Sequence, residues 1–100
     1  MIVSPGVPIL LRGINRKDRE MLTTYIRAAL RQAKYEILPD DETFYGNIAG
    51  FQGVWANAPS LEGCREELEE VLEEWILFSV ARRLPLPVVD GIELTIKEVA

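Results

Sequence analysis

Apolar and polar residues follow two different periods along the chain, and these periods separate helices from strands. Apolar positions three or four residues apart predict an amphipathic helix over about residues 17–33. They are Leu22, Tyr25, Ile26, Ala29, Leu30 and Ala33. A second, longer helix is predicted to begin after Ser60, which is a good N-cap residue, and to end before Pro85. Its apolar stripe comprises Leu61, Cys64, Leu68, Val71, Leu72, Trp75, Ile76 and Ser79.

Short runs rich in aromatic and branched residues lie between the two helices and predict three strands. The runs cover residues 35–38, 44–48 and 53–57. Gly50 and Gly53 are expected to adopt positive φ in a tight connection, and Tyr45 and Trp55 are expected to face each other across the strand pair. A final strand is predicted over residues 92–96. The predicted fold is therefore α+β with the order α-β-β-β-α-β, an antiparallel three- to four-stranded sheet with helices packed on it.

The first twenty residues show no clear period and contain two prolines and two glycines within thirteen positions. Two interpretations stay open for residues 1–20: a flexible N-terminal extension, or a mis-assigned start with Met21 as the true first residue. Residues 21–100 are expected to form a single domain, because 100 residues suffice for one domain and not for two.

Charge bears on the class of partner. The chain has 11 basic and 16 acidic residues, no histidine and a net charge of −5. Phosphate backbones repel such a domain, so the balance favours a basic partner over nucleic acid. The α-β-β-β-α order also matches double-stranded RNA-binding domains, but the second helix opens with Glu62, Glu66 and Glu67, the wrong sign for phosphate contacts.

Location and chemistry are constrained by what the sequence lacks. It has no apolar run of about 18 residues and no signal-peptide pattern, so we expect a cytoplasmic protein that does not bind membranes. Without histidine, a nucleophile elbow or a phosphate-binding loop, we expect no enzyme activity. Cys64 lies on an apolar stripe and is expected to be a buried hydrophobe. The acidic residues match no calcium loop, so we expect no metal and no cofactor.

The long helix carries seven of the sixteen acidic residues. They are Glu62, Glu66, Glu67, Glu69, Glu70, Glu73 and Glu74, and Arg65 is the basic residue among them. Like charges three or four residues apart repel each other by a few tenths of a kcal/mol per pair. Two interpretations stay open: a surface that attracts a basic protein, or a solvated face that aids solubility.

The stretch Phe44-Tyr45-Gly46-Asn47-Ile48-Ala49-Gly50-Phe51-Gln52-Gly53-Val54-Trp55-Ala56, followed by Ser60-Leu61-Glu62-Gly63-Cys64, resembles the HicB family of bacterial antitoxins. The family pattern is a strand ending in Tyr-x-Gly, then Ile-Pro-x-x-x-Gly-Val-x-Ala, then a long acidic helix. The chain departs from this pattern where Ala49 replaces proline and where Gly63 replaces a better helix former. The resemblance covers about residues 21–100.

The resemblance implies a partial RNase H-like domain without nuclease activity that occludes a small basic HicA-type, mRNA-cleaving toxin. Aromatic and polar groups around Tyr45, Trp55 and Asn57 are expected to supply buried contacts, and the helix acids are expected to steer association. The steering residues are Glu66, Glu70 and Glu73. Many HicB proteins add a C-terminal DNA-binding module. Because this chain stops at Ala100, we expect no autonomous DNA binding. The alternative is an orphan homo-oligomeric structural or regulatory module whose edge strands pair between subunits.

Overall fold

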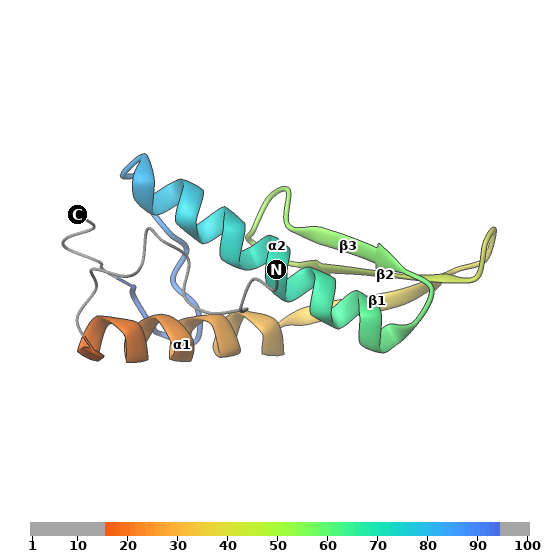
Figure 1. Ribbon diagram of the computed structural model, residues 1–100, viewed down its shortest axis with the longest axis horizontal. Helices are drawn as coiled ribbons and strands as arrows, with labels where there is room; N and C mark the ends of the chain where they lie inside the picture. Colours follow the sequence, from red (N-terminus) through yellow and green to blue (C-terminus); the bar gives the residue numbers. More distant parts are fainter. Residues whose placement is uncertain (1–15, 95–100) are drawn as a thin grey trace, which may run out of the picture.

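Residues 16–94 are described by a computed structural model, and they form two helices and one sheet (Figure 1). In chain order the elements are α1 (Arg16–Arg31), β1 (Ala33–Leu38), β2 (Thr43–Ile48), β3 (Trp55–Ala58) and α2 (Leu61–Ala81). The strands form an antiparallel sheet in the order β1-β2-β3. The α+β class and the antiparallel meander predicted from the sequence are confirmed.

α1 forms where the 3.6-residue period predicted it, and it buries Leu22 and Tyr25 against the rest of the core. It begins at Arg16, so the boundary predicted between residues 20 and 21 falls inside a helix. Residues 1–15 lie outside the described residues, and the start at Met21 stays a prediction. The expected end at residue 33 was wrong. Ala33 is the first residue of β1 and lies opposite Ile48, because a small apolar side chain there fits the strand period as well as the helical one.

α2 begins as predicted at Ser60, whose side-chain oxygen accepts a hydrogen bond from the backbone N–H of Gly63 at 3.0 Å. A Cβ atom at position 63 would lie 3.0 Å from that same oxygen, so the glycine leaves room for the cap. The buried stripe of the helix contains Cys64, Leu68, Leu72, Ile76 and Ser79. This stripe packs mainly against β3 and β2 (Figure 1).

The two faces of the sheet follow from the strand register, since residues opposite each other in an antiparallel pair point to the same side. The inner face, which α2 covers, consists of Ala33, Tyr35, Ile37, Phe44, Gly46, Ile48, Ala56 and Ala58. The outer face consists of Lys34, Glu36, Leu38, Thr43, Tyr45, Asn47, Trp55 and Asn57. The inner face is small at its centre, where Gly46 lies beside Ala56, and this lets the helix approach closely.

The connection between β2 and β3 contributes to the core instead of lying over it. Gly50 and Gly53 adopt φ values of 88° and 89°, which confirms the prediction for both. The turns they permit point Phe51 inward, where it is 3% exposed. Its ring lies edge-on to Tyr25, with centroids 6.2 Å apart, and edge-on to Trp75, at 5.1 Å. This loop therefore links α1 to α2.

The predicted final strand is not part of the sheet over residues 92–94, and residues 95–96 lie outside the described part of the chain. Ile92 instead pairs with Val89 across the Asp90-Gly91 turn, through two backbone hydrogen bonds of 2.6 and 3.1 Å. In this tight turn, Val89 and Ile92 form hydrogen bonds with each other through the backbone N–H and C=O groups that a strand would offer to a neighbouring strand. The segment is held to α1 by the Tyr25 hydroxyl, which donates to the carbonyl oxygen of Pro87 at 2.5 Å. Burial raises the pKa of Tyr25 to about 12.

Candidate partner-binding surface

The outer face of the sheet brings together the three residues predicted to make buried contacts with a partner. Tyr45 lies directly opposite Asn57, and its ring stacks on Trp55 with centroids 6.0 Å apart and planes inclined by 27°. The prediction that the two rings face each other is confirmed. Trp55 is 54% exposed, so this aromatic pair is not a core element. It offers a flat, rigid apolar surface with little conformational entropy to lose on binding.

Asn57 holds this face in place through its side chain. The amide nitrogen donates to Thr43 Oγ1 at 2.8 Å and to the carbonyl oxygen of Phe44 at 2.9 Å. Thr43 in turn donates to Asp41 Oδ1 from its hydroxyl at 2.7 Å and from its backbone N–H at 3.2 Å, and these two hydrogen bonds lower the pKa of the Asp41 carboxyl. Two strands and the turn before β2 are thereby linked next to the aromatic pair.

The three steering residues lie on α2, on the side roughly opposite its buried stripe. Glu66 and Glu70 are exposed, and Glu73 is half-buried. The helix carries seven glutamates and one arginine, a net charge of −6, so it accounts for the whole excess of acid in a chain of net charge −5. No glutamate of α2 forms an ion pair with another residue of the range 16–94. Partial burial, together with Glu69 and Glu70, raises the pKa of Glu73.

The six predicted residues therefore form two groups and not one surface. Tyr45, Trp55 and Asn57 are on the outer face, whereas the steering glutamates are on a helix that packs against the inner face. Alternation along the strands and periodicity along the helix locate each group, but neither pattern says on which side of the sheet the helix packs.

Glu67 joins the two groups, and sequence reasoning did not single it out. Its Oε1 accepts a hydrogen bond at 3.3 Å from the backbone N–H of Asn57, which faces away from β2 at the edge of the sheet. A groove of about 530 Å³ runs along this edge, lined by Gly53, Trp55, Ala56, Asn57, Glu67 and Val71. The sequence shows that Glu67 lies next to the buried stripe of α2. It does not show that the edge of β3 lies beside this glutamate.

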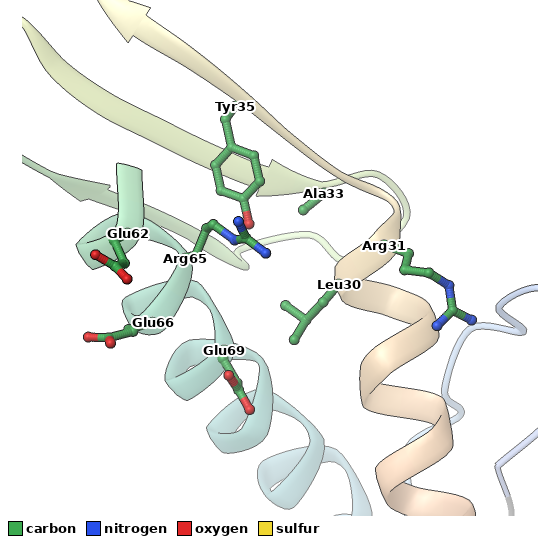
Figure 2. Close-up of a pocket in the computed structure, with 8 residues that line it drawn as sticks. All are labelled: Leu30, Arg31, Ala33, Tyr35, Glu62, Arg65, Glu66 and Glu69. Carbon is green, nitrogen blue, oxygen red and sulfur yellow. The ribbon is translucent and has the colours of Figure 1, made fainter. Parts of the chain in front are cut away.

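A second groove lies on the opposite side of α2, between that helix and the junction of α1 with β1 (Figure 2). It has a volume of about 580 Å³. Its walls are Leu30, Arg31, Ala33, Tyr35, Glu62, Arg65, Glu66 and Glu69. Arg65 points from α2 toward the hydroxyl of Tyr35, and the side chain of Leu30 points into the space between the two helices (Figure 2). The groove thus combines an apolar floor with charged walls.

The described residues contain few groups with catalytic or metal-binding chemistry. Cys64 is fully buried, as predicted, and burial together with nearby Glu67 raises the pKa of its thiol, which makes the thiolate scarce. No group of three or more potential ligands that could hold a metal ion occurs in the part of the chain that the structure describes. Neither of the two helices combines the length and the apolar character needed to cross a bilayer.

Comparison with known proteins places the chain in a family. The family model described as UPF0150-like matches residues 24–87, from α1 to the segment after α2. The chain belongs to the UPF0150-like family. This is the family of HicB-like, antitoxin-type proteins, which agrees with the resemblance seen in the strand and helix motifs.

Among solved structures, the UPF0150-like chain is similar to the crystal structure of TTHA0281 from Thermus thermophilus. The two share 35% sequence identity with a TM-score of 0.73, and the match covers 78% of this chain and 96% of that one. Among curated proteins, the comparison finds no match. The family and the neighbour therefore support the fold.

Proposed function

We propose that the protein is an antitoxin-like binding module that binds and occludes a small, basic, HicA-type mRNA-cleaving toxin. The observation that carries the proposal is the concentration of charge on α2, whose seven glutamates form no ion pairs within residues 16–94. A helix stabilised for its own sake would alternate acidic and basic residues. An excess of exposed carboxylates instead attracts a partner of the opposite charge, and an enzyme that binds RNA carries that charge.

The two groups of surface residues have different parts in this proposal. The α2 glutamates attract the toxin over a distance of about a Debye length, roughly 8–10 Å. The exposed Tyr45–Trp55 stack then provides an aromatic anchor of the kind that dominates protein interfaces. Glu67 lies where the edge of β3 meets α2, so a toxin seated along this edge reaches α2 and the aromatic stack together. The module acts in the cytoplasm by steric occlusion, without catalysis, cofactor or direct contact with nucleic acid.

The first test is co-expression with a small basic protein encoded by an adjacent reading frame, followed by purification through this chain alone. Co-purification of the basic protein and rescue of the growth arrest that it causes are the expected results. Recovery of this chain without a partner, and without rescue, would contradict the proposal.

Charge reversal then tests the role of α2. Glu66→Lys with Glu70→Lys changes two exposed residues and avoids half-buried Glu73. Association with the toxin should slow by about tenfold at low salt and lose most of its salt dependence, while the dissociation rate changes little. The matched control, Glu20→Lys with Glu93→Lys, changes the net charge equally at exposed sites outside α2. Equal slowing by both pairs would show that net charge matters and the α2 face does not.

A homo-oligomeric module without a toxin remains the second candidate. The observation in its favour is the edge strand β1, which pairs only with β2 among the described residues. An unpaired edge can add a strand from another chain. A stable oligomer that binds no neighbouring gene product would favour this candidate.

A further inference from the structure

The two grooves beside α2 differ in whether they contain positive charge of their own. The groove between α2 and the junction of α1 with β1 contains both signs, because Arg31 and Arg65 lie among its glutamates (Figure 2). The groove along the edge of β3, called here the β3-edge groove, is lined within residues 16–94 by one charged residue, Glu67. Glu67 forms no ion pair with another residue of that range. The described part of the chain therefore leaves the negative charge of the β3-edge groove without a counter-charge.

Glu67 is held in a position that leaves half of its carboxylate available. Its Oε1 accepts the backbone N–H of Asn57 at 3.3 Å, a hydrogen bond that joins α2 to β3. This bond fixes the direction of the carboxylate, and the side chain is exposed, so a second donor can reach Oε2. An acceptor that is already oriented loses less entropy when it binds a donor.

Trp55 gives the β3-edge groove an aromatic wall. One face of its indole stacks on Tyr45, yet the residue is more than half exposed. Tyr45 does not line the groove, so the part of the indole that borders the groove is separate from the face against Tyr45. The π-face of an indole attracts cations, and arginine is the commonest such partner in proteins. Half-buried Val71 adds apolar surface beside it.

The backbone of β3 adds further acceptors to the same edge. Asn57 directs its N–H away from β2, so its carbonyl oxygen and that of Trp55, two residues earlier, face the same way. A guanidinium has five N–H donors in a planar fork, so it can bind a carboxylate and a carbonyl while its plane lies on an aromatic ring. The ammonium group of lysine is a compact point charge and cannot make this combination of contacts.

We propose that the β3-edge groove binds an arginine side chain of a basic partner protein. The guanidinium pairs with Oε2 of Glu67 and stacks on Trp55, and its methylene stem packs on Val71. An added β-strand is the other occupant that a strand edge accepts, but Glu67 already takes the N–H of Asn57 that such a strand would use. The inference rests on the proposed function, since it names the group on the basic partner that this edge recognises.

The test is a titration of the full chain with the peptide acetyl-Gly-Arg-Gly-amide, followed by ¹H–¹⁵N NMR of the two tryptophan indole groups. We expect the Trp55 indole signal and the Asn57 amide signal to shift, and the signal of Trp75, which packs on Phe51, to stay in place. The same peptide with citrulline, a neutral isostere of arginine, should bind at least about tenfold more weakly. Equal affinity for both peptides, or shifts confined to Tyr35 in the other groove, would overturn the inference.

Two variants separate this groove from the general effect of acidic charge. Glu67→Gln keeps a side-chain oxygen that can accept from Asn57 and removes the charge, so the fold should survive while the Kd of the arginine peptide rises about fivefold. The matched control, Glu20→Gln, removes one exposed carboxylate of α1 and should leave the Kd unchanged. An unchanged Kd for Glu67→Gln, or equal weakening by both variants, would overturn the inference.

The result for the β3-edge groove can be told apart from the result for the toxin. A neighbouring basic protein that co-purifies and whose growth arrest is rescued, together with an arginine peptide that does not bind, would overturn the groove assignment and leave the proposed function standing. Binding of the peptide at Trp55, with no toxin recovered and no rescue, would support the groove assignment and contradict the proposed function.

Discussion

The inner and outer faces of the same sheet follow opposite rules. The inner face has small residues at its centre, Gly46 and Ala56, and α2 therefore buries Cys64 and Leu68 against it. The outer face carries its largest side chain, Trp55, where most of that side chain is exposed. A large apolar group contributes little to folding when it stays in water, which is why we propose a binding role for Trp55. The residues that stabilise the fold and those that we propose bind a partner thus lie on opposite faces of one sheet.

The sharpest test of this separation is Leu68→Ala on the helix side. Leu68 is fully buried, and its removal leaves a cavity between α2 and the sheet. We expect a loss of about 3 kcal/mol in the free energy of unfolding, measured by urea denaturation. A loss below about 1 kcal/mol would show that the inner face is not the stabilising one.

Gly46→Val tests the close approach on the same face. A Cβ atom at position 46 would lie 2.7 Å from the ring of Tyr35 and 3.3 Å from Cys64 Sγ. Tyr35 or α2 has to move, at a cost of about 2 kcal/mol. Thermal unfolding would measure it, and Tyr35→Ala added to the variant should recover part of the loss by removing the clash. A variant as stable as the original protein would show that the glycine is not needed for packing.

Trp55→Ala is the matching change on the outer face. We expect a stability loss of only about 1 kcal/mol, mainly from the stack with Tyr45. Affinity for the proposed toxin should fall by about 2 kcal/mol or more, roughly thirtyfold, in calorimetry. A variant that lost as much stability as Leu68→Ala but bound the toxin normally would contradict the division of roles between the two faces.

The smallest expected effect concerns Glu73 and depends on pH. Its raised folded pKa means that ionisation is less favourable in the folded protein than in the unfolded chain. Below the ordinary value of 4.5 the group is protonated in both states and costs nothing, whereas the penalty develops as pH rises through the raised pKa. Glu73→Gln should therefore gain a few tenths of a kcal/mol relative to the original protein at pH 7, and nothing at pH 3.5. Urea denaturation at pH 7 and at pH 3.5 measures the change in the free energy of unfolding. An equal change at both pH values would mean that the effect comes from packing and not from ionisation.

Much of the fold could be predicted because local rules decided it. The helical period located both helices, Ser60 marked the start of α2, and Gly50 and Gly53 marked the sharp connection between β2 and β3. Errors arose where one residue satisfied two rules. Ala33 fits a helix and a strand equally well, and the alternation around Ile92 predicted a strand where a tight turn satisfies the backbone locally.

The candidate surface was less predictable, because it depends on which elements meet. Sequence patterns placed Tyr45 beside Trp55 correctly but could not show that the steering glutamates lie on the other side of the sheet. The role of Glu67 at the β3 edge and the groove beside β1 both depend on how α2 crosses the sheet. That crossing is set by packing between residues distant in sequence, and no local pattern encodes it.

The hydrogen bond from Asn57 to Glu67 has a consequence for how the β3 edge meets other chains. An exposed strand edge offers its outward N–H and C=O groups to any extended chain that approaches it. Here the carboxylate of Glu67 already accepts the outward N–H of Asn57, and its charge makes this edge a poorer template for an added strand. Replacement of Glu67 by a residue unable to accept this bond would leave that N–H without this partner and make the β3 edge more adhesive.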